Sequence, residues 1–318
     1  MIAENAGAGR RSLCVIVPVY NEAESLPVLL PRLLAVLSGL AVQSRILFVD
    51  DGSDDASASL IEAAAEAHSE VGWIRLARNF GKEAALTAGL DHAEADAVVV
   101  IDADLQDPPE LIVEFWRQFE LGFDVVYGQR SARAGEGWLK RTTAALFYRL
   151  INWLSRTPLP RDSGDFRLLS RRAVLALRQL RERHRFMKGM FSWVGYRQTA
   201  VLYQRAARAA GVSKFNYWRL WNFALEGITS FSTIPLRVSG YVGLLTALSS
   251  FGFGLWIVFK TLVYGEPVRG YPSLMTVVLF LGGIQLMALG MIGEYLGRLY
   301  EESKQRPLYL IDTRHFPS

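Results

Sequence analysis

The sequence predicts an α/β fold with a mostly parallel sheet, followed by interfacial helices and two transmembrane helices. Three observations support this prediction. Short apolar runs alternate with helical patterns over the first part of the chain, which is typical of a parallel sheet covered on both faces. Polar segments follow the ends of several runs, and two long segments near the C-terminus carry no charge. We therefore expect a folded domain in water joined to a membrane-embedded part.

Five short apolar runs are the expected strands: LCVIV, ILFV, WIRLA, AVVVI and DVVYG, at 13–17, 46–49, 73–77, 97–101 and 124–128. The segments between them have helical spacing, at 22–38, 55–68, 82–95 and 108–121. Ligands bind beyond the carboxyl ends of the strands in such sheets. The polar segments PVYNE, DDGSDD and DADLQD, which follow three of these runs, are therefore expected to meet in one crevice.

Some polar residues of this crevice have a structural explanation. Asn21 and Glu24 have the spacing of a capping box, and Asp107 followed by Pro108 is typical of a helix start. Capping does not explain four other carboxylates: Asp50, Asp51, Asp102 and Asp104. Since these carboxylates repel one another, a cation is expected among them. Hard divalent ions take oxygen ligands, so Asp102 and Asp104 are the candidate metal ligands.

The two uncharged segments, 238–259 and 271–293, are each long enough to cross about 30 Å of hydrocarbon. A pair of buried core helices is the alternative. Basic residues lie outside the two segments: Lys214, Arg219, Arg237, Arg298, Lys304, Arg306 and Arg314. This distribution favours both ends in the cytoplasm. Residues 1–12 have no signal-peptide pattern, and the single cysteine, Cys14, suits a cytosolic domain.

The predicted organisation has three parts: a cytosolic domain at 1–236, a transmembrane hairpin at 237–293 and a cytosolic tail at 294–318. Two aromatic and basic segments, 138–154 and 215–231, are expected to lie in the membrane interface. The alternative is packing against the sheet or another subunit, and the second segment is a candidate for assembling a homo-oligomer. The net charge of +4 suits a neighbouring anionic lipid surface, and no nucleic-acid partner is expected.

Four motifs resemble glycosyltransferase family 2, with its GT-A fold: VIVPVYNE (15–22), VDDGSDD (49–55), RNFGKEAAL (78–86) and IDADLQDPPE (101–110). Further motifs narrow the resemblance: SGDFRLLSRRAV (163–174), GVSKF (211–215) and ITSFSTIPLR (228–237). With the paired apolar segments, they resemble the branch that loads a sugar onto a polyprenyl phosphate, which includes bactoprenol glucosyltransferases and dolichyl-phosphate mannose synthases. The motifs are specific for the branch but not for the sugar.

The resemblance implies a role for each matching residue. A nucleoside pocket would be lined by Pro18, Tyr20, Glu22, Val49 and Asp51. The diphosphate and its Mg²⁺ or Mn²⁺ would be held by Asp102, Ala103 and Asp104, with Gln106 near the sugar or metal. Arg130 would approach the sugar or the acceptor phosphate, and Arg208 and Lys214 would hold phosphate oxygens. Arg130 and Arg208 could instead be ordinary surface arginines.

Asp165, in SGDFR, occupies the place often proposed for the catalytic base, although it could also cap a loop beside Gly164. A phosphate monoester has a second pKa near 6 and is mostly dianionic at pH 7. Such a nucleophile needs little deprotonation. We therefore expect Asp165 to position the acceptor or a sugar hydroxyl more than to act as a base.

The expected activity is inverting, metal-dependent transfer of a sugar from a nucleotide-sugar to a polyprenyl phosphate at the bacterial inner membrane. SGDFR is closer to the glucosyl type, which favours UDP-glucose. GDP-mannose, UDP-N-acetylglucosamine, UDP-galactose and UDP-aminoarabinose are alternative donors. A processive polysaccharide synthase is a second alternative, although such enzymes carry a Gln-x-x-Arg-Trp motif that this sequence lacks. A non-catalytic membrane partner for assembly or lipid transport is a third.

Overall fold

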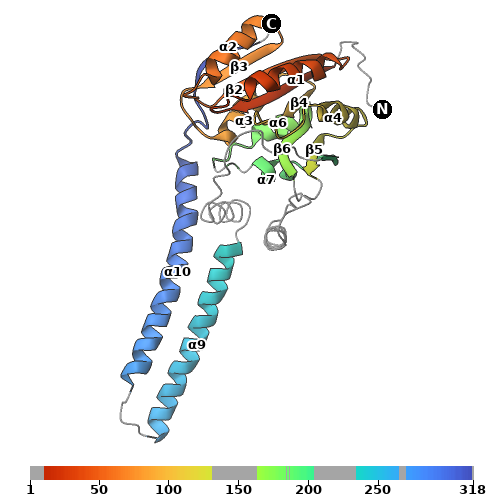
Figure 1. Ribbon diagram of the computed structural model, residues 1–318. Helices are drawn as coiled ribbons and strands as arrows, with labels where there is room; N and C mark the ends of the chain where they lie inside the picture. The colour runs from red at the N-terminus through yellow and green to blue at the C-terminus, as the bar shows by residue number, and fades with distance from the viewer. Residues whose placement is uncertain are drawn as a thin grey trace, which may run out of the picture. The chain divides into compact units, whose positions relative to one another are not determined.

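The computed structural model describes residues 11–130, 163–183, 185, 187–203, 234–264 and 270–316. The chain divides into two units, and Arg306–Ser318 returns to the first of them. The first unit is an α/β domain, and the second contains the long helices α9 and α10 (Figure 1). The interfacial segments predicted at 138–154 and 215–231 lie outside the described residues.

The α/β domain is built on an eight-stranded sheet with the order β7-β5-β6-β4-β1-β2-β3-β8. Its strands are β1 (Ser12–Val19), β2 (Gln43–Asp50), β3 (Val71–Leu76), β4 (Ala97–Val100), β5 (Val125–Arg130), β6 (Ser163–Ser170), β7 (Gln198–Tyr203) and β8 (Ile311–His315). Strands β4, β1, β2 and β3 are parallel, and β5 is parallel to β7. Strand β6 is antiparallel to β4 and β5, and β8 is antiparallel to β3. The predicted α/β fold with a mostly parallel sheet is confirmed.

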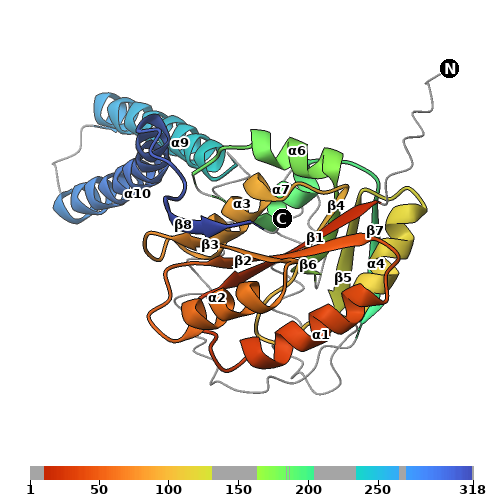
Figure 2. The ribbon, with the colours of Figure 1, turned by 90° about the horizontal axis from the view of Figure 1, so that it is seen from above.

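Helices cover both faces of the sheet (Figure 2). They are α1 (Leu26–Ser38), α2 (Ser57–Ala67), α3 (Lys82–His92), α4 (Leu111–Glu120), α6 (Arg171–Gln179) and α7 (Met187–Trp193). Helices α1, α2 and α4 bury their apolar stripes on one face, against alternate residues of β1 such as Val15 and Val17. Helix α3 lies on the other face beside α6. Because both faces of the sheet are covered, β1 is a continuous apolar run and does not alternate between apolar and polar residues.

Two glycines allow the close approaches that shape the pocket edge. A Cβ on Gly89 of α3 would lie 2.5 Å from Cγ2 of Ile16, so glycine lets this helix pack close to β1. Gly52, just after β2, has φ +69°, and a Cβ there would lie 2.6 Å from the carbonyl carbon of Arg78. The β2–α2 loop therefore lies directly against the backbone of the β3–α3 loop.

The two capping interpretations are wrong. Asn21 has φ 55°, and its Oδ1 accepts a hydrogen bond from the backbone of Asp54, so it joins two loops instead of starting a helix. Helix α1 begins after Ser25. Asp107 is buried and accepts a hydrogen bond from the hydroxyl of Tyr203, at the end of β7. Local spacing could not predict either tertiary partner.

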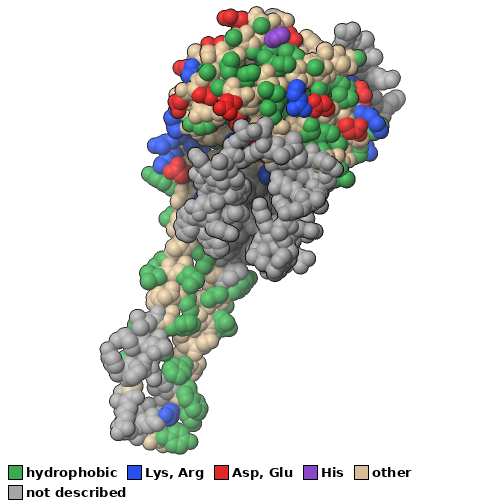
Figure 3. Space-filling view, viewed as in Figure 1, with side chains coloured by type: hydrophobic (Ala, Val, Ile, Leu, Met, Phe, Trp, Pro, Cys, Tyr) green, Lys and Arg blue, Asp and Glu red, His purple; other side chains and the backbone are tan. Residues whose placement is uncertain are grey.

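The second unit contains α9 (Ile234–Tyr264) and α10 (Tyr271–Ser303). Large apolar side chains lie exposed along both helices (Figure 3). Within the described residues, one segment, Phe280–Ser303, is long and apolar enough to cross a membrane. The crossing of two helices therefore stays a prediction.

The predicted C-terminal tail, 294–318, begins within helix α10, which continues to Ser303. Glu, Leu and Arg support a helix as well as apolar residues do, so the helix does not end where the apolar pattern ends. Residues 311–315 then form β8, a strand of the sheet.

We expect Gly52→Ala to lower the free energy of unfolding of the α/β domain by about 2 kcal/mol, because the substitution adds a Cβ at positive φ against fixed backbone. Thermal unfolding followed by circular dichroism measures this loss. Gly39→Ala is the matched control, since Gly39 has φ −78° and its added Cβ would have ordinary space. Equal losses in the two variants would contradict the close-approach argument.

Candidate active site

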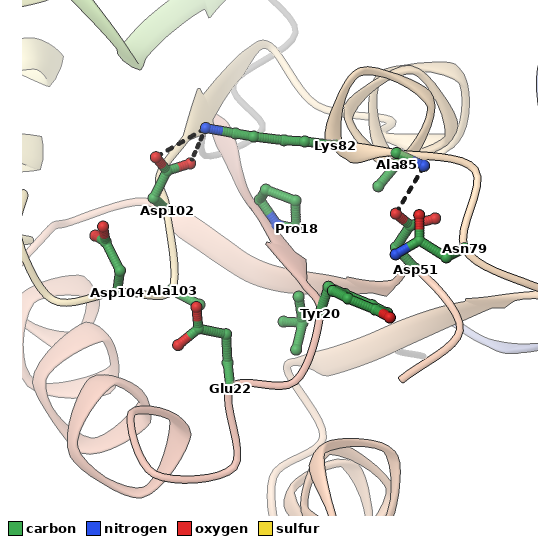
Figure 4. Close-up of a pocket in the computed structure, with 12 residues that line it drawn as sticks. Pro18, Tyr20, Glu22, Asp51, Asn79, Lys82, Ala85, Asp102, Ala103 and Asp104 are labelled. Carbon is green, nitrogen blue, oxygen red and sulfur yellow. Dashed lines mark hydrogen bonds and ion pairs between the residues drawn. The ribbon is translucent and has the colours of Figure 1, made fainter. Parts of the chain in front are cut away.

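A pocket lies at the carboxyl ends of β1, β2 and β4, where the polar segments were expected to meet (Figure 4). The loop between β3 and α3 completes it. Its lining residues are Pro18, Val19, Tyr20, Glu22, Asp51, Asn79, Gly81, Lys82, Ala85, Asp102, Ala103 and Asp104. The topology therefore brings together three motifs that are far apart in the sequence.

Asp51 fixes the loop that begins α3. Its Oδ1 accepts a hydrogen bond from the amide of Phe80 at 2.8 Å, and its Oδ2 accepts one from the amide of Gly81 at 2.9 Å. Burial raises the pKa of Asp51, and these two amides lower it, with a raised value as the net result. The carboxylate thus determines where the chain enters α3, and Lys82 is the first residue of that helix.

Lys82 crosses the pocket to the Asp-x-Asp motif (Figure 4). Its Nζ lies 2.7 Å from Oδ1 and 2.8 Å from Oδ2 of Asp102. The same Nζ lies 2.6 Å from Oδ2 of Asp165, in β6. One ammonium group therefore bridges two carboxylates, one in the loop after β4 and one in β6. The side chains of Asp102 and Asp165 are 22 % and 13 % exposed, so this bridge is largely shielded from water.

The pKa values of the two bridged carboxyls are shifted in opposite directions. Burial raises the pKa of Asp102, Lys82 lowers it, and the charge of Asp165 raises it again, so the net change is upward. Burial also raises the pKa of Asp165, but Lys82 and Lys188 lower it more, and the net change is downward. Burial lowers the pKa of Lys82, yet the two carboxylates more than reverse this and raise it. Asp165 is therefore held in its ionised form.

A buried arginine holds the strand backbone that carries Asp165. Arg167 donates hydrogen bonds to the carbonyl of Gly164 at 2.7 Å and to the carbonyl of Asp165 at 3.4 Å. Its guanidinium lies 3.8 Å from the centre of the Phe191 ring, a favourable cation–π distance. Burial lowers the pKa of Arg167 to about 10, against the carboxylates that raise it. The backbone around Asp165 is thus fixed from inside the domain.

Glu83 lies beside this group in α3. Its Oε2 is buried and has no hydrogen-bond partner among the described residues. Burial is the main cause that raises its pKa to about 7, and the charge of Asp165 adds to it. Lys82 and Lys188 lower it in part. Glu83 is therefore the carboxyl of this group that titrates near neutral pH.

Most of the predicted nucleotide-binding residues line the pocket: Pro18, Tyr20, Glu22, Asp51, Asp102, Ala103 and Asp104. Val49 is instead buried under α3, close to Gly89. Gln106 is also buried, outside the pocket lining, and its Nε2 has no hydrogen-bond partner in the described part of the chain. Arg130 ends β5, and its side chain is not described. Arg208 and Lys214 lie outside the described residues.

Sequence reasoning missed the contribution of the β3–α3 loop. Asn79, Gly81 and Lys82 line the pocket, and their motif had been noted without a role for any residue. One signal was available: Lys82 opens a helix, where the positive end of the helix dipole disfavours a cation. A lysine at that position indicates a nearby negative group.

The carboxylates have the chemistry of a divalent-metal site. Asp102 and Asp165 already surround a cation, the ammonium of Lys82, and Asp104 contributes a further negative charge that raises the pKa of Asp102. No group of three or more candidate ligands that could hold a metal occurs in the described ranges. Mg²⁺ is often bound by one or two carboxylates, with substrate phosphates completing its coordination.

Residues 14–178 match the family model "Glycosyl transferase family 2", and residues 234–299 match "GtrB C-terminal hairpin". A bactoprenol glucosyl transferase of Shigella phage SfV is 51 % identical over 299 residues, which cover 94 % of this chain and 97 % of that one. An uncharacterized glycosyltransferase of Synechocystis sp. is 50 % identical over 299 residues, covering 94 % of each chain. Glucosyl-3-phosphoglycerate synthase from Mycobacterium tuberculosis is a structural neighbour at 21 % identity, with a TM-score of 0.49 and coverage of 69 % of this chain and 76 % of that one.

We expect Glu83→Gln to change the pH dependence of stability. The pKa of Glu83 is about 7 in the folded protein and 4.5 ordinarily. Between these values the folded state binds more protons here than the unfolded state, so the free energy of unfolding falls as pH rises. Glutamine resembles the neutral acid and removes this slope. From pH 5 to pH 8 the variant should gain roughly 1–3 kcal/mol relative to the wild type, as measured by thermal unfolding.

Glu110→Gln is the comparison variant, because the pKa of Glu110 is shifted in the opposite direction. Burial raises the pKa of Glu110, but its hydrogen bonds with Arg32 and the charge of Arg32 lower it, and the net change is downward. The relative stability of this variant should therefore not rise with pH. A Glu83→Gln variant that showed no gain by pH 8 would contradict the raised pKa.

Proposed function

Because the chain belongs to glycosyltransferase family 2, we propose that this enzyme transfers glucose from UDP-glucose to a polyprenyl phosphate, with inversion at the sugar carbon. The observation that carries the proposal is the pocket in which the Asp-x-Asp motif and Lys82 meet the loops after β1 and β2, with Asp165 paired to Lys82. The names of relatives about half identical to the chain support the same acceptor and sugar.

The nucleotide-sugar would occupy the pocket described above. Tyr20 and Asp51, at the ends of β1 and β2, would lie beside the base or ribose, and Pro18 and Glu22 would complete the nucleoside side. Asp102 and Asp104 would hold Mg²⁺ or Mn²⁺, with Ala103 beside the diphosphate. The bound ion supplies a Lewis acid that neutralises charge on the leaving diphosphate. Gln106, under the same loop, would support the sugar side.

Asp165 is suited to positioning more than to proton transfer. Its pKa is lowered by Lys82 and its carboxylate is paired at 2.6 Å, so it is a weak proton acceptor. The acceptor phosphate is already mostly dianionic at pH 7. The reaction then needs orientation and charge compensation. Arg130, Arg208 and Lys214 are the proposed cations for the acceptor phosphate.

The membrane part would keep the lipid tail of the acceptor in the bilayer. Residues 280–303 have the length and composition of a membrane span, and the family model that matches 234–299 is described as a hairpin. We propose two crossings of the bacterial inner membrane, with the catalytic domain and both termini in the cytoplasm. The segments 138–154 and 215–231 would lie at the interface, and the second would contribute to a homo-oligomer.

We expect the purified full chain to release UDP from UDP-glucose when undecaprenyl phosphate and Mg²⁺ or Mn²⁺ are present. Asp102→Asn should lower the rate by about 10²–10³-fold, since a lost metal ligand removes several kcal/mol of charge stabilisation. Asp312→Asn is the matched control, because Asp312 is exposed in β8. No release with any common donor would overturn both enzyme hypotheses and favour a non-catalytic partner, and polymeric product would favour a processive synthase.

The donor is tested by thermal unfolding with a panel of UDP- and GDP-sugars and Mn²⁺, because binding stabilises the folded state. The largest shift should come from UDP-glucose. A larger shift with GDP-mannose, or with a UDP-sugar other than UDP-glucose, would replace the proposed donor and leave the acceptor unchanged.

We expect Asp165→Asn to lower activity by no more than about tenfold above pH 7.5, with a loss that does not deepen as pH falls. A general base contributes about 10²–10⁴-fold, so a tenfold loss separates positioning from proton transfer. The pH profile of kcat/KM for UDP release gives the measurement. A loss in the range of 10²–10⁴-fold would assign Asp165 the role of base.

A further inference from the structure

Lys82 lies where the cation of this site is expected. Its ammonium contacts three carboxylate oxygens from two residues: Oδ1 and Oδ2 of Asp102 at 2.7 and 2.8 Å, and Oδ2 of Asp165 at 2.6 Å. Asp104 adds negative potential to the same place, since its charge raises the pKa of Asp102. An ammonium is a compact single charge that donates three hydrogen bonds. Lys82 therefore offsets the negative charges of Asp102 and Asp165 as a small cation would.

The position of Lys82 does not serve helix stability. It is the first residue of α3, where the helix dipole favours negative groups and disfavours a cation. Gly81 has φ +97°, and Asp51 holds its amide at 2.9 Å. The loop is thus fixed in a conformation that places the lysine backbone at the pocket rim. This placement instead lets the side chain of Lys82 offset the charge of the two carboxylates that it contacts.

The side chain of Lys82 can move away from its partners within the pocket. It is 41 % exposed and lines the pocket, whereas its partners Asp102 and Asp165 are 22 % and 13 % exposed. The ammonium can therefore leave Asp102 without unfolding its surroundings, and four rotatable methylene groups let it swing within the same pocket.

We propose that Lys82 is a tethered cation that occupies the metal position of the donor-free enzyme and exchanges places with the divalent ion when the nucleotide-sugar binds. This inference rests on the proposed function. If an ammonium and a divalent ion both contacted the same carboxylate, their positive charges would repel each other. Lys82 must therefore leave Asp102 for the ion to bind. A diphosphate in the pocket offers the displaced ammonium a new negative partner.

The exchange makes metal and nucleotide binding cooperative. Without a nucleotide, an incoming ion competes with Lys82 for Asp102 and gains no phosphate ligands, so it binds weakly. With a nucleotide, the diphosphate contributes ligands to the ion and a partner to Lys82. Linkage requires that each ligand then raises the affinity for the other by the same factor. While the donor is absent, the lysine keeps the carboxylates of Asp102 and Asp165 at fixed positions.

The test measures Mn²⁺ binding to the full chain in detergent by electron paramagnetic resonance of the free ion, with and without UDP. In the wild type, UDP should tighten Mn²⁺ binding by about tenfold or more. In Lys82→Met, Mn²⁺ alone should bind about tenfold more tightly than to the wild type, and the effect of UDP should shrink. Lys82→Ala repeats the measurement with a smaller side chain, and thermal unfolding verifies that each variant is folded.

Lys188→Met is the matched control. Lys188 also acts on the charge of Asp165, but from α7. Loss of this charge alone should tighten Mn²⁺ binding by no more than about threefold. If UDP promotes Mn²⁺ binding but the Lys82 variants bind the ion no more tightly than the wild type, the exchange is overturned and the proposed function stands. If Mn²⁺ binds to none of the proteins even with UDP, the metal-dependent function is overturned together with the exchange.

Discussion

The mutual repulsion of carboxylates at one edge of the sheet is the constraint on which the rest of the site depends. The parallel order of β1, β2 and β4 brings Glu22, Asp51 and the Asp-x-Asp motif to the same edge. The negative charges of Asp51 and Asp102 are offset in different ways. Asp51 is bound by two backbone amides, and Asp102 shares Lys82 with Asp165. The loop between β3 and α3 supplies both kinds of compensation, and this explains why the loop is so tightly fixed.

Helix α3 connects this site to the end of the chain. Its first residue, Lys82, enters the pocket, and its last turn carries Asp91. The carboxylate of Asp91 accepts hydrogen bonds from Tyr309 at 2.9 Å and from Arg181 at 2.7 Å. Tyr309 precedes β8, which pairs with β3 after the chain returns from α10. The segment beyond the long helices is thus part of the catalytic domain and holds the helix that positions the pocket lysine.

The sequence was sufficient for the strands that bury both faces and for the motifs at their ends. Each of the five predicted apolar runs lies in a strand, with at most one residue outside it, because continuous apolar runs are decisive in a covered parallel sheet. Strands β6, β7 and β8 were not predicted. The segments SGDFRLLS and IDTRH mix polar and apolar residues and gain their partners only through tertiary pairing. Tertiary context also gave Asn21 and Asp107 partners that spacing cannot indicate. The partners of Lys82 are likewise tertiary, and its position at a helix start was the one local signal of them.

The charge pattern of the site also restricts what kind of chemistry it favours. A carboxylate that works as a base near neutral pH needs a raised pKa, and Asp165 has a lowered one because Lys82 lies against it. The carboxyl with a pKa of about 7 is Glu83, which faces the buried side of this group and is absent from the pocket lining. The Lys82–Asp165 pair is thus arranged to hold fixed charges. This arrangement suits a reaction between two phosphorylated substrates, in which the protein must offset negative charge more than it must move a proton.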